Sequence, residues 1–127
     1  MILVDTSIWI DHLHRTEEGL VDALNRSEVL QHPMVIGELA LGTLRDRNSV
    51  LGLIANLPAA FAATHVEILR FIETNELYGQ GLSLVDVHLL AAARLIPGAT
   101  LWTRDKKLWS AAQRMGIAHD LDEKARE

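Results

Sequence analysis

The sequence contains no cysteine, and this absence excludes disulfide bonds, iron–sulfur clusters and zinc sites built from thiolates. It also lacks any apolar run long enough to cross a membrane, and its start, Met-Ile-Leu-Val-Asp, has no positively charged region of the kind found in signal peptides. Internal repeats and low-complexity segments are missing too. We therefore expect a compact protein of the cytoplasm without membrane association.

Positive charge is also scarce, because 12 lysine and arginine residues stand against 17 aspartate and glutamate residues and the formal net charge is −5. Affinity for nucleic acid through general neutralisation of phosphates is therefore not expected. The charge balance still leaves catalysis on nucleic acid open, since carboxylates can hold divalent cations that supply positive charge locally.

Apolar residues, by contrast, make up 49% of the 127 residues. A chain of this length buries roughly two-thirds of its unfolded surface, which is enough for one sizeable core, so we predict a single domain over residues 1–127. Residues 120–127 are rich in charge and give no packing signal, and we expect them to form a flexible charged tail.

Strand and helix patterns alternate along the chain. The short apolar run at 2–4 and the stretch Thr-Leu-Trp-Thr at 100–103 indicate buried strands, with weaker strand signals at 28–32, 59–64 and 117–119. Helical spacing of apolar residues predicts helices at 8–14, 17–25, 33–44, 49–57, 65–77, 84–95 and 106–115. This alternation indicates the α/β class, with a parallel sheet and right-handed crossovers.

Several polar residues and one glycine are placed to begin or end these helices. We expect Thr6 and Ser7 to cap the first helix, Thr16 the second and Ser83 the helix at 84–95. Gly116 follows the last helix in the position typical of a helix-ending glycine.

Four acids occur at positions that matter for chemistry. Asp5 and Asp105 follow the two clear strands, where open α/β sheets place their ligand sites. Asp86 begins a helix, where the helix dipole alone would favour an acid, and Glu38 stands in an apolar helix where burial would be costly. If the four met, neighbouring carboxylates about 5 Å apart would repel by roughly 3 kcal/mol at an effective dielectric constant of 20. We therefore predict a site for Mg²⁺, with Mn²⁺ as a substitute.

Four motifs carry a resemblance to a known family: VDTSIWI at 4–10, VIGEL at 35–39, LSLVDVHLLAA at 82–92 and LWTRD at 101–105. In order and spacing they resemble the PIN-domain proteins of the VapC type, which are ribonuclease toxins of type II toxin–antitoxin pairs. The resemblance covers essentially the whole chain. It implies a three-layer α/β/α fold with a small central parallel sheet.

The same resemblance assigns roles to residues. It implies that Asp5, Glu38, Asp86 and Asp105 form the acidic tetrad and that Thr103 is the hydroxyl residue of the site, with Thr6 and Ser7 lining it. Asp5, Asp86 and Asp105 would hold the metal ion, and Glu38 would position or deprotonate the attacking water. Many relatives have an acid or asparagine two positions after the last acid, and because Lys107 stands there we expect one Mg²⁺ and not two.

Substrate and partners follow as further expectations. The implied activity is endonucleolytic cleavage of single-stranded or structured RNA, such as tRNA, rRNA or mRNA. Arg45, Arg94, Arg104 and Lys106 are candidates to bind RNA phosphates, although each is also explained as a solvated surface charge. The apolar helices at 33–44 and 49–57 would serve a homodimer interface and a groove for the cognate VapB-type antitoxin.

Two other functions remain open at this point. A catalytically silent interaction module could keep the fold and only bind a partner. A receiver-type signalling domain also has an acidic Mg²⁺ pocket, but it would need a second acid beside Asp5, where Thr6 stands, and a lysine after a late strand, where Arg104 stands. Binding of Mg²⁺ in a calorimetric titration would distinguish an active site from a silent module.

Overall fold

A computed structural model describes residues 1–119 of the chain. Its sheet has three parallel strands in the order β2-β1-β3, with β1 (Ile2–Val4) between β2 (Val29–Leu30) and β3 (Thr100–Trp102). Leu3 of β1 pairs with Leu30 on one side and with Leu101 on the other. The two strands that the sequence marks most clearly are therefore neighbours, which brings their carboxyl ends together.

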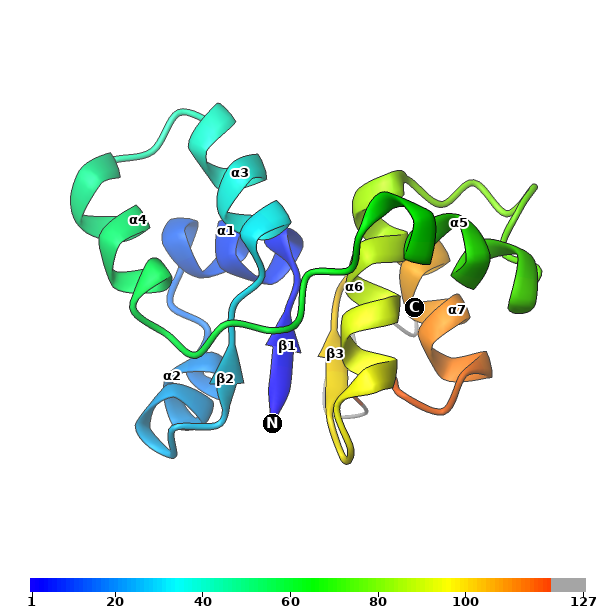
Figure 1. Cartoon of the computed structure of the whole chain (residues 1–127). Helices are drawn as coiled ribbons and strands as arrows, with labels where there is room; N and C mark the ends of the chain where they lie inside the picture. Colours follow the sequence, from blue (N-terminus) through cyan, green and yellow to red (C-terminus); the bar gives the residue numbers. More distant parts are fainter. Residues whose placement is uncertain (120–127) are drawn as a thin grey trace.

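Seven helices accompany the strands within residues 1–119: α1 (Thr6–His14), α2 (Glu18–Asn25), α3 (Pro33–Leu41), α4 (Arg47–Ala55), α5 (His65–Thr74), α6 (Leu84–Leu95) and α7 (Lys106–Arg114). In Figure 1, α1, α3 and α4 lie together on one side of the strands, and α5, α6 and α7 lie on the other. The predicted three-layer α/β/α arrangement with a small central parallel sheet is confirmed.

The core is built on the strands and includes buried residues of α1, α2, α3 and α6. Leu3 and Leu101 are fully buried, as expected for parallel strands that are covered on both faces. In α6, every residue from 87 to 93 is buried, so this helix is surrounded by protein over most of its length. It packs on β3, α5, α7 and α3, which fixes the position of its first turn relative to the strand ends.

Some predicted boundaries were wrong. The third helix ends at Leu41 instead of continuing to residue 44, because Gly42 has extended backbone angles. The fifth ends at Thr74 instead of residue 77. No strand forms at 59–64 or at 117–119; Ala59 and Ala118 make only isolated bridges. The expected tail at 120–127 lies outside the described residues.

The expected helix caps were partly right. Ser83 caps α6, and Gly116 follows α7 with φ +73. The cap of α1 was assigned to the wrong residues, because the helix begins at Thr6 and its N-cap is Asp5, whose carboxylate makes no capping bond. Glu17, and not Thr16, is the N-cap of α2. Among the residues described, no helix is long and apolar enough to span a membrane.

Candidate active site

Four of the polar residues predicted for the site lie at strand ends or helix starts. Asp5 and Thr103 directly follow β1 and β3, so both lie at the carboxyl edge of the sheet. Asp105 is the N-cap of α7, and Asp86 lies in the first turn of α6. This edge is where open α/β sheets bind their ligands.

Asp5 is the central member of this group and is only 6% exposed. Its Oδ2 atom accepts hydrogen bonds from Ser7 Oγ at 2.9 Å and from Thr103 Oγ1 at 2.7 Å. The two hydroxyls are held in turn by backbone N–H groups, since Arg104 N donates to Ser7 Oγ and Asp105 N donates to Thr103 Oγ1. The turn at 103–105 thus fixes the orientation of the Asp5 carboxylate.

Asp86 and Asp105 each use one carboxylate oxygen to begin a helix. Asp86 Oδ2 accepts from Ser83 N at 2.9 Å, and Ser83 Oγ accepts from Asp86 N, which completes a capping box. Asp105 Oδ1 accepts from Leu108 N at 2.9 Å. Within residues 1–119, the other oxygen of each acid has no hydrogen-bond partner. The helix-capping explanation of these acids is therefore correct but leaves one oxygen of each available to a ligand.

The acids also act on one another electrostatically. Burial raises the pKa of Asp5 against the opposing hydrogen bonds from Thr103 and Ser7, and the charge of Glu38 raises it further. Burial raises the pKa of Asp86 as well; the hydrogen bonds of Ser83 oppose this, and the charges of Asp105 and Asp5 add to it. The charged groups that act on these two carboxyls are thus themselves acids, and the edge favours the binding of a cation.

Glu38 differs from its sequence-based description. It is exposed on α3 and not buried among the apolar residues of that helix, so the argument from the cost of burial was wrong. Thr6 Oγ1 donates to Glu38 Oε1 at 2.6 Å, which connects the first turn of α1 to α3. Glu38 therefore stands at the solvent side of the group, beside Asp5.

The donor set fits a hard divalent cation. Carboxylate and hydroxyl oxygens are the ligands that Mg²⁺ and Mn²⁺ prefer. Among residues 1–119, no three Asp, Glu or His side chains are close enough together to form a complete ligand group. Magnesium is commonly held by one or two carboxylates while it keeps several waters, so pairs such as Asp5 with Asp86 suit it without a protein cage.

The four candidate phosphate-binding cations lie in very different places. The Arg104 side chain is only 11% exposed, and its guanidinium binds Asp11 Oδ2 at 2.6 Å and Glu17 Oε2 at 2.7 Å. It is therefore engaged by the protein itself. Arg94 lies in the last turn of α6, at the end opposite Asp86, and it donates to a backbone carbonyl there. Both arginines thus contact groups of the protein itself, and Arg94 lies at the end of α6 away from Asp86.

The other two cations are candidates by position. Lys106 begins α7 next to Asp105 and is exposed. Arg45 is exposed in the connection between α3 and α4 and makes no ion pair within residues 1–119. The ion pairs of Arg104 with Asp11 and Glu17 were missed at the sequence level, where only the closeness of Arg104 to Thr103 pointed to a role at the site.

The raised pKa values give a test of cation binding by the folded protein. A raised native-state pKa adds stability that is fully present below the ordinary value of 3.8 for Asp5 and Asp86, and this stability is lost as the pH rises through the native pKa. At pH 7 the ion-free protein therefore bears the cost of two ionised carboxylates. We expect Mg²⁺ at about ten times its Kd to raise the Tm by about 5 °C at pH 7.

The measurement is thermal unfolding with Mg²⁺ and with EDTA between pH 5 and pH 7.5. The shift should shrink toward pH 5, because protonated carboxyls no longer bind the ion. Asp22→Asn, which changes an exposed acid on α2, should keep the full shift. A Tm that is insensitive to Mg²⁺ at pH 7 would contradict the assignment of a cation site.

Comparisons with known proteins agree with this geometry. A family model described as PIN domain matches residues 2–114. Two relatives, each named Ribonuclease VapC32 and each from Mycobacterium tuberculosis (strains CDC 1551 / Oshkosh and ATCC 25618 / H37Rv), are 48% identical over 118 residues. The matched region covers 93% of this chain and 95% of each relative. The chain therefore belongs to the PIN-domain family, and within it to the VapC type.

Proposed function

We propose that the protein is the toxin of a type II toxin–antitoxin pair and an endoribonuclease that depends on Mg²⁺, with Mn²⁺ as a substitute. The observation that carries the proposal is Asp5: a buried carboxylate at the strand ends that interacts electrostatically with Glu38 and Asp86. The names of the relatives support the choice of RNA as substrate. Membership of the PIN-domain family also removes the receiver-type alternative.

Each residue of the site has a separate proposed role. Asp5, Asp86 and Asp105 would hold the ion directly or through water, each with a carboxylate whose orientation is set by neighbouring hydroxyls or N–H groups. A bound divalent cation supplies an activated water and stabilises the leaving oxygen. Glu38, exposed next to Asp5, accepts a proton from the attacking water, and Thr6 orients the Glu38 carboxylate. Thr103 and Ser7 keep Asp5 in place.

The test is cleavage of bulk tRNA, rRNA and mRNA by the purified protein with Mg²⁺, with Mn²⁺ and with EDTA. Cleavage should require the divalent ion. Products should lack a 2′,3′-cyclic phosphate, because water and not the neighbouring 2′-hydroxyl attacks phosphorus. Cyclic phosphate ends or full activity in EDTA would refute the proposal. Absence of Mg²⁺ binding together with absence of cleavage would favour the silent interaction module.

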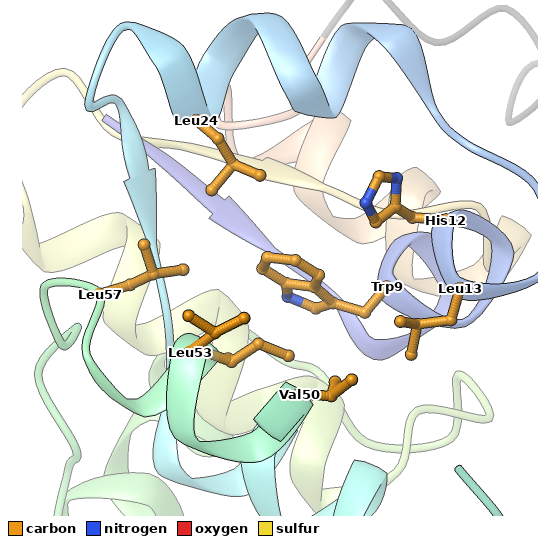
Figure 2. A pocket seen from close by; sticks show the side chains of 8 residues that line it. Trp9, His12, Leu13, Leu24, Val50, Leu53 and Leu57 are labelled. Carbon is orange, nitrogen blue, oxygen red and sulfur yellow. The ribbon is translucent and has the colours of Figure 1, made fainter. Parts of the chain in front are cut away.

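The antitoxin is proposed to bind an apolar pocket of about 350 Å³ between α1, α2 and α4. Figure 2 shows the Trp9 indole at its centre, with Leu24, Val50 and Leu53 around it. Leu53 is 70% exposed although it is apolar, which suits a surface that a partner covers. None of the four acids lines the pocket, so antitoxin binding here and catalysis use separate residues.

Leu53→Lys is expected to weaken binding of the antitoxin encoded by the adjacent reading frame at least tenfold, because a charge replaces an apolar contact. Val66→Lys is the matched control, since Val66 is also exposed and apolar but lies on α5. Affinity can be measured by calorimetry. Equal loss of affinity in both variants would argue against this pocket.

A homodimer is proposed through the exposed face of α3. Leu41 is 90% exposed and Met34 is 39% exposed, which leaves apolar side chains of this helix without cover in one copy of the chain. Size exclusion with light scattering should give a dimer at micromolar concentration and a monomer for Leu41→Glu. A monomeric wild type would refute the dimer.

A further inference from the structure

A second hollow, of about 240 Å³, lies between α1 and the connection that follows α3. Ile10, Leu13 and Leu44 form its apolar walls, and His14 and Arg45 supply polar groups at its rim. Ile10 is absent from the lining of the apolar pocket between α1, α2 and α4. The two hollows can therefore be tested by separate substitutions.

This hollow continues from the acidic site along one face of α1. Residues four and seven positions apart share a helix face, so Thr6, Ile10 and Leu13 follow one another in a row. Thr6 begins this row and donates to Glu38 at the site. One helical turn rises by about 5.4 Å, so Ile10 lies roughly one turn beyond the acids. A chain that leaves the site in this direction enters the hollow directly.

Charge distinguishes the hollow at Arg45 from the hollow that contains Arg104. The hollow that contains Arg104 is also lined by Arg15, but three acids outnumber these two cations and would repel a phosphate: Asp11, Glu17 and Glu18. No carboxylate lines the hollow with Arg45. Within residues 1–119, the Arg45 guanidinium has no hydrogen bond or ion pair, although the chain as a whole has an excess of acids.

We propose that this hollow is a nucleotide subsite that binds the residue of single-stranded RNA next to the cleaved phosphate. The base lies against Ile10, Leu13 and Leu44, and Arg45 pairs with the phosphate of that nucleotide, with His14 as an additional hydrogen-bonding group. The subsite rests on the proposed ribonuclease function. Apolar walls without a fixed pattern of polar groups around the base predict contact with little base preference.

The experiment measures binding of a fluorescein-labelled single-stranded RNA of 12 nucleotides and mixed sequence to the full chain by anisotropy. Ca²⁺ replaces Mg²⁺, and gels verify that the probe stays intact. Arg45→Gln should weaken binding about fivefold at low salt and reduce the slope of log affinity against log salt by about 0.7, the value for one phosphate on a single strand. Ile10→Ala should weaken binding about threefold and leave the slope unchanged.

Arg70→Gln serves as the control, because Arg70 is an exposed arginine on α5, away from this row. It should change neither affinity nor slope. Cleavage assays should give a higher KM for Arg45→Gln with kcat retained.

Three results would overturn the subsite: no binding of the probe by the wild type, unchanged binding by Arg45→Gln, or loss of antitoxin affinity with RNA affinity intact. The last would assign the hollow to a protein partner. Failure of the ribonuclease proposal gives a different result. If the wild type binds the probe more tightly than Arg45→Gln but cuts no RNA, the proposed catalysis is refuted and the subsite is not.

Discussion

Asp5→Asn is expected to lower the rate of RNA cleavage about 1000-fold while the protein remains folded. The substitution keeps the size of the side chain and its ability to accept from Ser7 and Thr103, whose hydroxyls donate to Oδ2. It removes the negative charge that would hold the cation. Loss of a group that stabilises charge in the transition state typically costs two to three powers of ten, and loss of the ion itself adds to this.

Stability should respond in the opposite direction to activity. Burial raises the pKa of Asp5, so its ionised form opposes folding when no cation is bound. A neutral amide avoids this cost, and in EDTA at pH 7 we expect the Tm of Asp5→Asn to equal or exceed that of the wild type. Circular dichroism and thermal unfolding, together with single-turnover cleavage, give both quantities.

Asp22→Asn is the matched control for this experiment, because it makes the same chemical change at an exposed position of α2. Its cleavage rate and Tm should stay close to the wild type. If Asp5→Asn kept even a tenth of the wild-type rate, the site proposed at the strand ends would be wrong.

The strand ends were predictable because the pattern there is local. Unbroken apolar runs at 2–4 and 101–102 indicate strands buried on both faces, and each run ends at the polar residues of the site. Asp86 was predictable for the same reason: Ser83 and Asp86 stand three residues apart before an apolar run, which is the pattern of a capping box.

The environment of Glu38 could not be predicted in this way. Apolar residues occur all round α3, so the sequence does not reveal which face is covered. In the structure Val35 and Leu39, one turn apart, are the buried residues, while Leu41 is 90% exposed. Glu38 lies on the exposed face. Tertiary packing, and not the pattern within the helix, decides which side of α3 is buried.

The sequence identified the basic residues but did not indicate which of them lie near the site. Arg94 and Arg45 have the same charge, but the first lies at the far end of α6 from Asp86 and the second lines a hollow that continues from the site. Arg104 meets Asp11 across a separation of 93 residues, and no local pattern encodes such a contact.

Arg104→Met is expected to lower kcat about 100-fold with little change in KM. The guanidinium joins the turn at 103–105 to Asp11 on α1 and to Glu17 before α2, through two charge-assisted hydrogen bonds. The same turn supplies the N–H of Arg104 to Ser7 and the hydroxyl of Thr103 to Asp5. A shift of about 1 Å in a catalytic group can cost two powers of ten in rate, so loosening this turn should act on kcat.

The free energy of unfolding should fall by about 1 to 2 kcal/mol, a modest value because Asp11 is half exposed and solvent screens its pairing. Arg104→Lys should give an intermediate kcat, since a lysine can bind one of the two carboxylates but cannot reproduce the planar fork. Arg70→Met, at an exposed position on α5, should alter neither quantity. Steady-state kinetics and urea unfolding provide the measurements.

The split between kcat and KM decides what Arg104 does. A residue that contacts RNA would raise KM and reduce the dependence of binding on salt when it is replaced. A residue that only stabilises the fold would lower the free energy of unfolding and leave kcat unchanged in the folded fraction. Because the side chain is engaged by Asp11 and Glu17 and its own backbone N–H supports Ser7, a fall in kcat at constant KM, partly restored by lysine, is the outcome that a positioning role requires.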